Sequence, residues 1–172
     1  MSTLNHWAAI GLGSNLGDRA ANLLSAITRL IEAGIKVVRS SAIYETDPVD
    51  YLAQPAFLNM VVLVESTDLP SPQALLSLCL QIENELKRER LIAKGPRTID
   101  LDLLLYDDTI LAQTNFPVLS LPHPRLHERL FVLIPLVELI GDYQHPILGS
   151  SYRQLLAQLA VPDKVERYGN GI

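Results

Sequence analysis

Cysteine is scarce in this chain and long apolar runs are missing, and both features exclude whole classes of protein. A single cysteine, Cys79, stands among 172 residues, so no internal disulfide can form, as is usual in a reducing cytoplasm. No stretch approaches the roughly 20 apolar residues of a membrane-spanning helix, and the first residues lack the basic start and apolar run of a signal peptide. The sequence therefore predicts a cytoplasmic protein with no membrane partner, in which Cys79 is a small buried residue.

Basic residues are missing from one long stretch and crowded in another. No Lys or Arg lies between Arg39 and Lys87, whereas five of the fourteen fall within positions 87–97. The net charge of −5 argues against a nucleic-acid partner. One local basic patch on an acidic protein suits a small anionic ligand, although the patch alone would also fit the solvated charged end of a helix.

The order of apolar patterns indicates an α+β fold in one domain, residues 1–172. Period-2 patterns predict strands over 7–12, 36–44, 57–64 and 99–106, and period-3.6 patterns predict helices after residue 18, from 70, over 131–140 and over 152–159. The order βαββαβ matches a ferredoxin-like core with helices packed on an antiparallel sheet. We expect this core over about 5–140, a C-terminal extension over 141–172 whose residues 163–172 fray, and a monomer.

Two acidic residues inside the last core strand carry most of the chemical information. Asp100 and Asp102 are two apart, so in a strand both carboxylates point to one face, ~7 Å apart at the backbone. Such a pair repels unless a cation lies between its members, and Mg²⁺ takes one or two carboxylates together with water and substrate phosphate. The alternative is two solvated carboxylates, each paired with an arginine. The preceding Gly-Pro-Arg-Thr and the basic patch favour a metal-bridged polyphosphate.

Two further motifs have weaker signals. The glycines of Gly11-Leu-Gly13-Ser-Asn-Leu-Gly17, with Arg39 after them, could indicate an NADP-binding turn, but too few parallel βα units follow, so a tight structural turn is preferred. His123 lies between two prolines and near Arg125 and Arg129, which makes it a candidate phosphate contact. His127 is interpreted as a solvated residue at the start of a helix.

Taken in order, these motifs resemble the 6-hydroxymethyl-7,8-dihydropterin pyrophosphokinase family of folate biosynthesis. The matching segments are Gly-Ser-Asn-Leu-Gly at 13–17, Tyr-Glu-Thr at 44–46, Gln-Pro-Ala-Phe-Leu-Asn at 54–59, Arg-Glu-Arg at 88–90, Gly-Pro-Arg-Thr-Ile-Asp-Leu-Asp at 95–102, Pro-His-Pro at 122–124 and Arg-Leu-Phe at 129–131. The segment at 95–102 is highly specific to that family. The sequence departs from the family pattern at Asp50 and Lys94.

The resemblance implies an Mg²⁺-dependent diphosphotransferase that moves pyrophosphate from ATP to the hydroxymethyl group of a reduced pterin and releases AMP. It implies two Mg²⁺ ions on Asp100 and Asp102, with Arg88 and Arg97 as catalytic contacts to the phosphates. The implied ATP-binding residues are Glu83, Arg90, His123 and Arg129. The implied pterin-binding residues are Thr46, Val49, Phe57, Asn59 and Phe131.

Two alternatives stay open at this point. Phe131 could be a core residue at the start of an apolar helix and not a pterin contact. The whole chain could be a non-catalytic module that binds a nucleotide or metabolite on the same fold, because a fold alone does not fix a function. A module that only binds would not need paired metal-binding acids together with two arginines.

Overall fold

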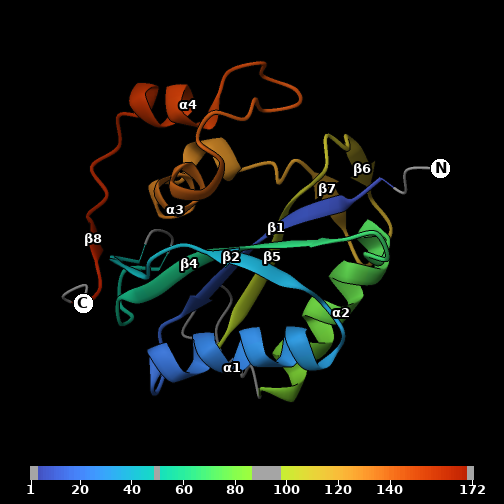
Figure 1. Ribbon diagram of the computed structural model, residues 1–172. Coiled ribbons are helices and arrows are strands. Elements are labelled where there is room, and N and C mark those ends of the chain that lie inside the picture. The colour runs from blue at the N-terminus through green and yellow to red at the C-terminus, as the bar shows by residue number, and fades with distance from the viewer. Residues whose placement is uncertain (1–3, 49–50, 87–97, 170–172) are drawn as a thin grey trace.

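The computed structural model describes residues 4–48, 51–86 and 98–169. Its six-stranded antiparallel sheet lies between two layers of helices (Figure 1). Five strands run in the order β5-β1-β4-β3-β8, and β2 also pairs with β4. Their bounds are β1 His6–Ser14, β2 Val37–Ser40, β3 Tyr44–Thr46, β4 Phe57–Ser66, β5 Asp100–Tyr106 and β8 Val165–Arg167. The order confirms the ferredoxin-like prediction, except that the strand expected over 36–44 is divided into β2 and β3.

Helices pack on both faces of the sheet (Figure 1). Helices α1 (Arg19–Glu32) and α2 (Pro72–Glu85) lie on one face and α3 (Leu130–Ile140) lies on the other, while α4 (Tyr152–Gln158) packs on the outer side of α3. The carboxylate of Asp18 caps α1, and the hydroxyl of Ser71 caps α2 ahead of its first-turn proline. Among the described residues, no helix is both long and apolar enough to cross a bilayer.

The core beneath α1 and α2 is continuous. Alternate residues of β1 and β4 point into it, as the period-2 patterns require, and meet the apolar stripes of both helices. Cys79 of α2 is fully buried there, as predicted, and burial together with the negative charges of Glu83 and Asp102 raises the pKa of its thiol to about 12.

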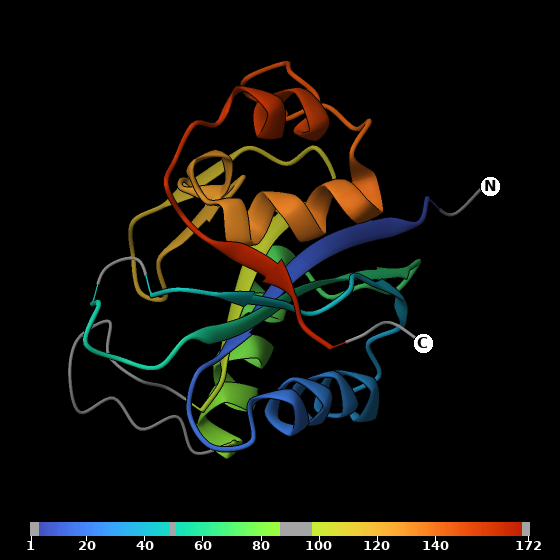
Figure 2. The same ribbon diagram turned by 90° about the vertical axis from the view of Figure 1, so that its left-hand side faces the viewer.

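The C-terminal segment joins the sheet. Strand β8 pairs antiparallel with β3, with Glu166 opposite Glu45, so the expected fraying is wrong for Val165–Arg167 (Figure 2). A short hairpin of β6 (Leu111–Gln113) and β7 (Leu119–Leu121) lies apart from this sheet, and a 3-10 turn over Leu126–Glu128 precedes α3.

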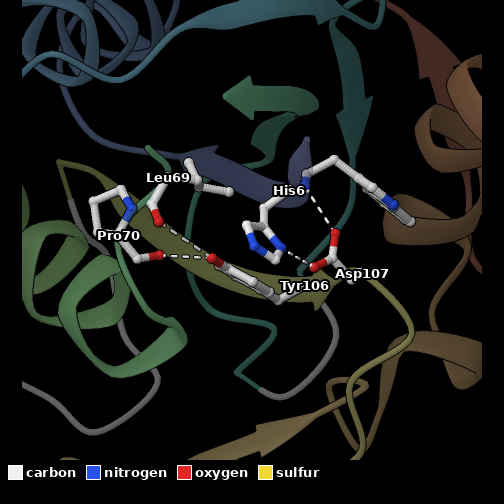
Figure 3. A network of polar contacts seen from close by, with 6 residues as sticks. His6, Leu69, Pro70, Tyr106 and Asp107 are labelled. Carbon is white, nitrogen blue, oxygen red and sulfur yellow. Dashed lines mark hydrogen bonds and ion pairs between the residues drawn. The ribbon is translucent and has the colours of Figure 1, made fainter. Parts of the chain in front are cut away.

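Direct polar contacts fasten the sheet at the start of β1 and the end of β5 (Figure 3). The His6 ring nitrogen Nδ1 lies 2.6 Å from Asp107 Oδ2, and the Trp7 amide donates to Asp107 Oδ1 at 2.9 Å. The Tyr106 hydroxyl donates to the Pro70 carbonyl at 2.9 Å, which joins β5 to the start of α2. All of these contacts lie at one end of β5, and Asp100 lies at the other end.

Candidate active site

The candidate site is the part of one sheet face that α3 leaves open. Where α3 packs, the strands present apolar residues, among them Ala9, Val61 and Leu104. Further along the same strands the face changes to glycines and polar residues, which line a cavity of about 280 Å³. A cavity of this kind, with a few converging polar groups, is the usual form of a small-molecule site.

Gly13 forms the middle of the cavity floor. It pairs with Asn59 of β4 on one side and with Asp100 of β5 on the other, so the three residues form one row across the sheet. A Cβ at position 13 would lie 2.9 Å from Asn59 Oδ1, closer than real contacts allow. Glycine therefore lets the amide of Asn59 lie over the neighbouring strand, and a strand glycine commonly marks such a close approach.

Asp100 and Asp102 both line the cavity, as their spacing predicts. Both are partly buried, and Asp102 lies opposite a second floor glycine, Gly11. Over residues 4–48, 51–86 and 98–169, no group of three or more His, Cys, Asp or Glu is placed to hold a metal. Two hard oxygen donors beside open space nevertheless fit Mg²⁺, which fills its other positions with water and phosphate oxygens.

His123 brings a neutral imidazole to the same cavity. Its amide donates to the Leu104 carbonyl at 2.9 Å, and its Nδ1 accepts the Arg125 amide at 3.2 Å. Burial, and then the positive charge of Arg129, lower the pKa of His123 to about 4, although Asp100 acts in the opposite direction. Because Nδ1 is an acceptor, the neutral ring carries its proton on Nε2 and can donate it to an anion.

Arg129 and Phe131 line the cavity where α3 begins. The Arg129 guanidinium lies 5.5 Å from the centre of the Phe131 ring, within cation–π range. Phe131 is partly buried and packs against the core beneath α3 while it also lines the cavity, so it has the core contacts considered from the sequence, and its contact with a pterin stays a prediction.

Thr46, Phe57 and Asn59 line the other side of the cavity. The Asn59 amide nitrogen donates to Thr46 Oγ1 at 2.7 Å, and both side chains are buried. This bond fixes the orientation of the amide and turns Oδ1 into the acceptor over the floor.

The sequence did not single out two residues that the structure adds to the cavity, Asp47 and Gln54. Asn15, which is 1% exposed, donates through Nδ2 to Gln54 Oε1 and to the Pro55 carbonyl, both at 3.0 Å. The sequence signal for this contact is Asn15, a polar residue within the glycine-containing turn at 13–17.

Glu83 lies apart from the cavity-lining residues. Its side chain is on α2, 3% exposed, and Oε1 accepts the amide of Leu101 at 2.8 Å. It therefore contacts the backbone between the two aspartates and not the cavity itself. Four of the predicted site residues, Val49, Arg88, Arg90 and Arg97, fall outside the described residues, as do Asp50 and Lys94.

The NADP alternative has no support in the fold. The sheet is antiparallel, and Arg39 donates to the Leu139 carbonyl at 2.9 Å. The turn after β1 instead packs against the segment that precedes β4, through Asn15.

Comparison with known proteins gives a consistent picture. A family model described as 7,8-dihydro-6-hydroxymethylpterin-pyrophosphokinase matches residues 9–141. The 2-amino-4-hydroxy-6-hydroxymethyldihydropteridine pyrophosphokinase of Bacillus subtilis is 47% identical over 137 residues, which are 79% of each chain. The protein of the same name from Methylorubrum extorquens is 44% identical over 161 residues, 93% of this chain and 97% of that one.

Longer proteins are also similar to this chain. The folic acid synthesis protein fol1 of Pneumocystis carinii is 46% identical over 147 residues, and the match spans only 19% of its length. A crystal structure of HPPK-DHPS in complex with substrates superposes with a TM-score of 0.72 at 16% identity, over 89% of this chain and 43% of that one. That likeness shows the shared fold. With the family model covering most of the sequence, the chain belongs to the 7,8-dihydro-6-hydroxymethylpterin-pyrophosphokinase family.

Proposed function

We propose that this protein transfers pyrophosphate from ATP to the hydroxymethyl group of 6-hydroxymethyl-7,8-dihydropterin, giving AMP and the pterin diphosphate. One observation carries the proposal. The carboxylate pair and the Asn59–Thr46 amide–hydroxyl pair share one cavity, separated by the bare backbone of Gly13. A charged polyphosphate and a flat heterocycle can therefore bind side by side, which a transfer between them requires.

On the phosphate side, Asp100 and Asp102 would hold two Mg²⁺ ions. When bound, the ions would neutralise the charge of the triphosphate and orient it. Arg88 and Arg97 would contact the same phosphates and stabilise charge as the pyrophosphoryl group moves. The described residues support this half through two carboxylates on one strand face beside Arg129 and His123.

We assign direct contact with ATP to His123, Arg129 and Arg90, and an indirect role in ATP binding to Glu83. His123 donates from Nε2 as a neutral group, and Arg129 supplies positive charge at the start of α3. The Glu83 carboxylate, bonded to the Leu101 amide, fixes the strand between the two aspartates and so acts through their position. Its role is indirect, in contrast to a direct contact with ATP.

On the pterin side, Phe57 and Phe131 would hold the flat ring, with Thr46, Val49 and Asn59 around its edge. An aromatic face against a heterocycle contributes about 1 kcal/mol beyond the area it buries. Asn59 offers Oδ1 to a ring N–H because its Nδ2 is already bonded to Thr46. The pterin hydroxymethyl oxygen would then attack the β-phosphorus of ATP and release its proton to solvent, while the bond from the β-phosphorus to the α–β bridging oxygen breaks and AMP leaves with that oxygen.

In this reaction the protein binds and orients the two substrates and neutralises the charge of the phosphates. No covalent intermediate forms on its own residues. Phosphoryl transfer generally depends on positioning and electrostatic stabilisation. We further propose that the chain acts as one catalytic domain, as a monomer, in the cytoplasm. Sedimentation at micromolar concentration tests the monomer.

The test of the function is AMP release from ATP with and without the pterin, and with and without Mg²⁺. We expect AMP to form only when the pterin and Mg²⁺ are both present. ADP as the nucleotide product would exclude pyrophosphate transfer. Binding of both ligands with no AMP would favour a non-catalytic binding module.

A further inference from the structure

The C-terminal strand β8 is paired with the strand that leads into the pterin side of the cavity. The Tyr168 amide donates to the Ile43 carbonyl at 2.8 Å, and Glu166 lies opposite Glu45. Hydrogen-bonded and non-bonded pairs alternate along an antiparallel ladder, so Glu45 and Glu166 form the next bonded pair. The Arg167 amide, between these two pairs, faces away from β3.

Arg19, the first residue of α1, joins the two ends of the connection between β3 and β4. Its Nη1 lies 2.7 Å from Glu45 Oε2 and donates to the Ala56 carbonyl at 2.9 Å. Glu45 is the residue before Thr46, and Ala56 is the residue before Phe57. One guanidinium nitrogen thus connects the backbone neighbours of two cavity residues.

Tyr168 connects these two features. Its ring centre lies 5.8 Å from the Arg19 guanidinium, within cation–π range. Tyr168 therefore bonds β3 through its amide and packs on Arg19 through its ring. Neither Arg19 nor any residue of β8 lines the cavity, so their effect on a ligand must pass through β3 and β4.

We propose that β8, Tyr168 and Arg19 form a clamp that positions Thr46 and Phe57 for the pterin and leaves the phosphate side unaffected. The ligand named here rests on the proposed function. The clamp has a direct consequence for Asn59, because its amide is oriented by Thr46. If β3 shifts, Asn59 loses the partner that orients its amide, whereas Asp100 and Asp102 lie on β5, three positions from β3 in the strand order, and should keep their places.

The first experiment needs no ligand. Hydrogen exchange is compared between Glu166→Pro, which removes an amide bonded to β3, and the matched control Arg167→Pro, which removes an amide that faces away. We expect faster exchange at 44–46 and 57–59 in Glu166→Pro only, with β5 unchanged. Glu166→Ala controls for the loss of the side chain and should behave as the wild type. Unchanged exchange at 44–46 in Glu166→Pro would overturn the clamp.

The second experiment measures KM for each substrate in Glu166→Pro, Arg19→Met and Arg19→Lys. We expect the pterin KM to rise about tenfold in the first two, equivalent to about 1.4 kcal/mol, with partial recovery in Arg19→Lys and little change in the ATP KM or kcat. Equal losses for both substrates would indicate a purely structural role and overturn the proposal. A wild type that makes no AMP would instead refute the proposed function, and the exchange contrast would still decide whether the clamp exists.

Discussion

One face of the sheet has two halves, one covered by α3 and one left open. Both are built from the same strands, but they differ in the side chains that they present. The half covered by α3 presents Ala9 and Val61, both at most 1% exposed, and Leu104 lies at its boundary, where it also lines the cavity. The open half presents Gly11, Gly13 and the polar residues of the cavity. The pairing of β1 with β4 is continuous from one half to the other, whereas the register of β1 and β5 shifts between Ala9 and Ile10, where the two halves meet.

This difference separates stability from function along single strands. Apolar residues beneath α3 contribute to stability by burial, whereas polar residues in the open half line the cavity in which a ligand can bind. The two halves should therefore respond to substitution in opposite ways. Changes in the covered half should lower the free energy of unfolding, and changes in the open half should lower activity.

The largest effect is expected from Asp102→Asn and Asp100→Asn in the open half. Each change removes a negative oxygen that is proposed to bind Mg²⁺ and keeps the shape of the side chain. We expect kcat to fall about a hundredfold or more, since removal of one preorganised electrostatic contact typically costs about 10²–10³ in kcat. Steady-state AMP formation at saturating Mg²⁺ measures this. Near-normal turnover by both folded variants would contradict the metal assignment.

The covered half is tested by Leu136→Ala. Leu136 of α3 is fully buried against the sheet. Truncation should lower the free energy of unfolding by about 2–5 kcal/mol, because a cavity is left in a packed core. Urea denaturation measures the loss, and calorimetry should show ATP and pterin affinities close to those of the wild type. A variant of normal stability with weakened ligand binding would reverse the comparison.

The two floor glycines offer a finer test within the open half. In Gly13→Ala the added carbon would lie 2.9 Å from Asn59 Oδ1, whereas in Gly11→Ala the nearest atom is a Leu104 methyl at 3.4 Å. We expect Gly13→Ala to displace the Asn59 amide and raise the pterin KM about tenfold, or about 1.4 kcal/mol. Gly11→Ala should raise it much less. Equal effects would show that the contact with Asn59 is not what requires glycine at 13.

The last test concerns pH and His123. Its pKa is about 4 in the folded protein against 6.5 in the unfolded chain, so the unfolded state binds more protons between these values. Stability should therefore fall as the pH is lowered from 6.5 towards 4. His123→Gln should reduce this slope without abolishing it, since burial also lowers the pKa of His145. Urea denaturation across the window tests it, and an unchanged slope would contradict the buried, neutral state.

Local patterns in the sequence predicted much of this arrangement. The i, i+2 spacing of Asp100 and Asp102 was enough to place both on one strand face, and apolar periodicity located the main helices. Pairing across strands was not accessible, because register depends on partners far away in the chain. The row of Asn59, Gly13 and Asp100 joins three strands that are distant in the sequence, and no single one of them predicts the row.

Strand β8 and Glu83 show the same limit. β8 has three residues and no clear periodicity, and it is ordered by pairing with β3, so a prediction from composition alone gave a frayed tail. Glu83 matched a family position, yet the direction of its side chain depends on how α2 packs against β5. Sequence reasoning named the residue, and only the fold shows that it contacts the backbone of β5.

The most direct test of the central claim follows the phosphate groups themselves. ATP labelled separately at the β- and γ-phosphorus is allowed to react with 6-hydroxymethyl-7,8-dihydropterin and Mg²⁺, and the products are separated. If one cavity joins the two substrates as proposed, both labels will appear together on the pterin, in equal amount to the AMP formed, and Asp102→Asn will lose this transfer while Leu136→Ala keeps it. Transfer of the γ-label alone with release of ADP, or no labelled pterin at all, would contradict the account.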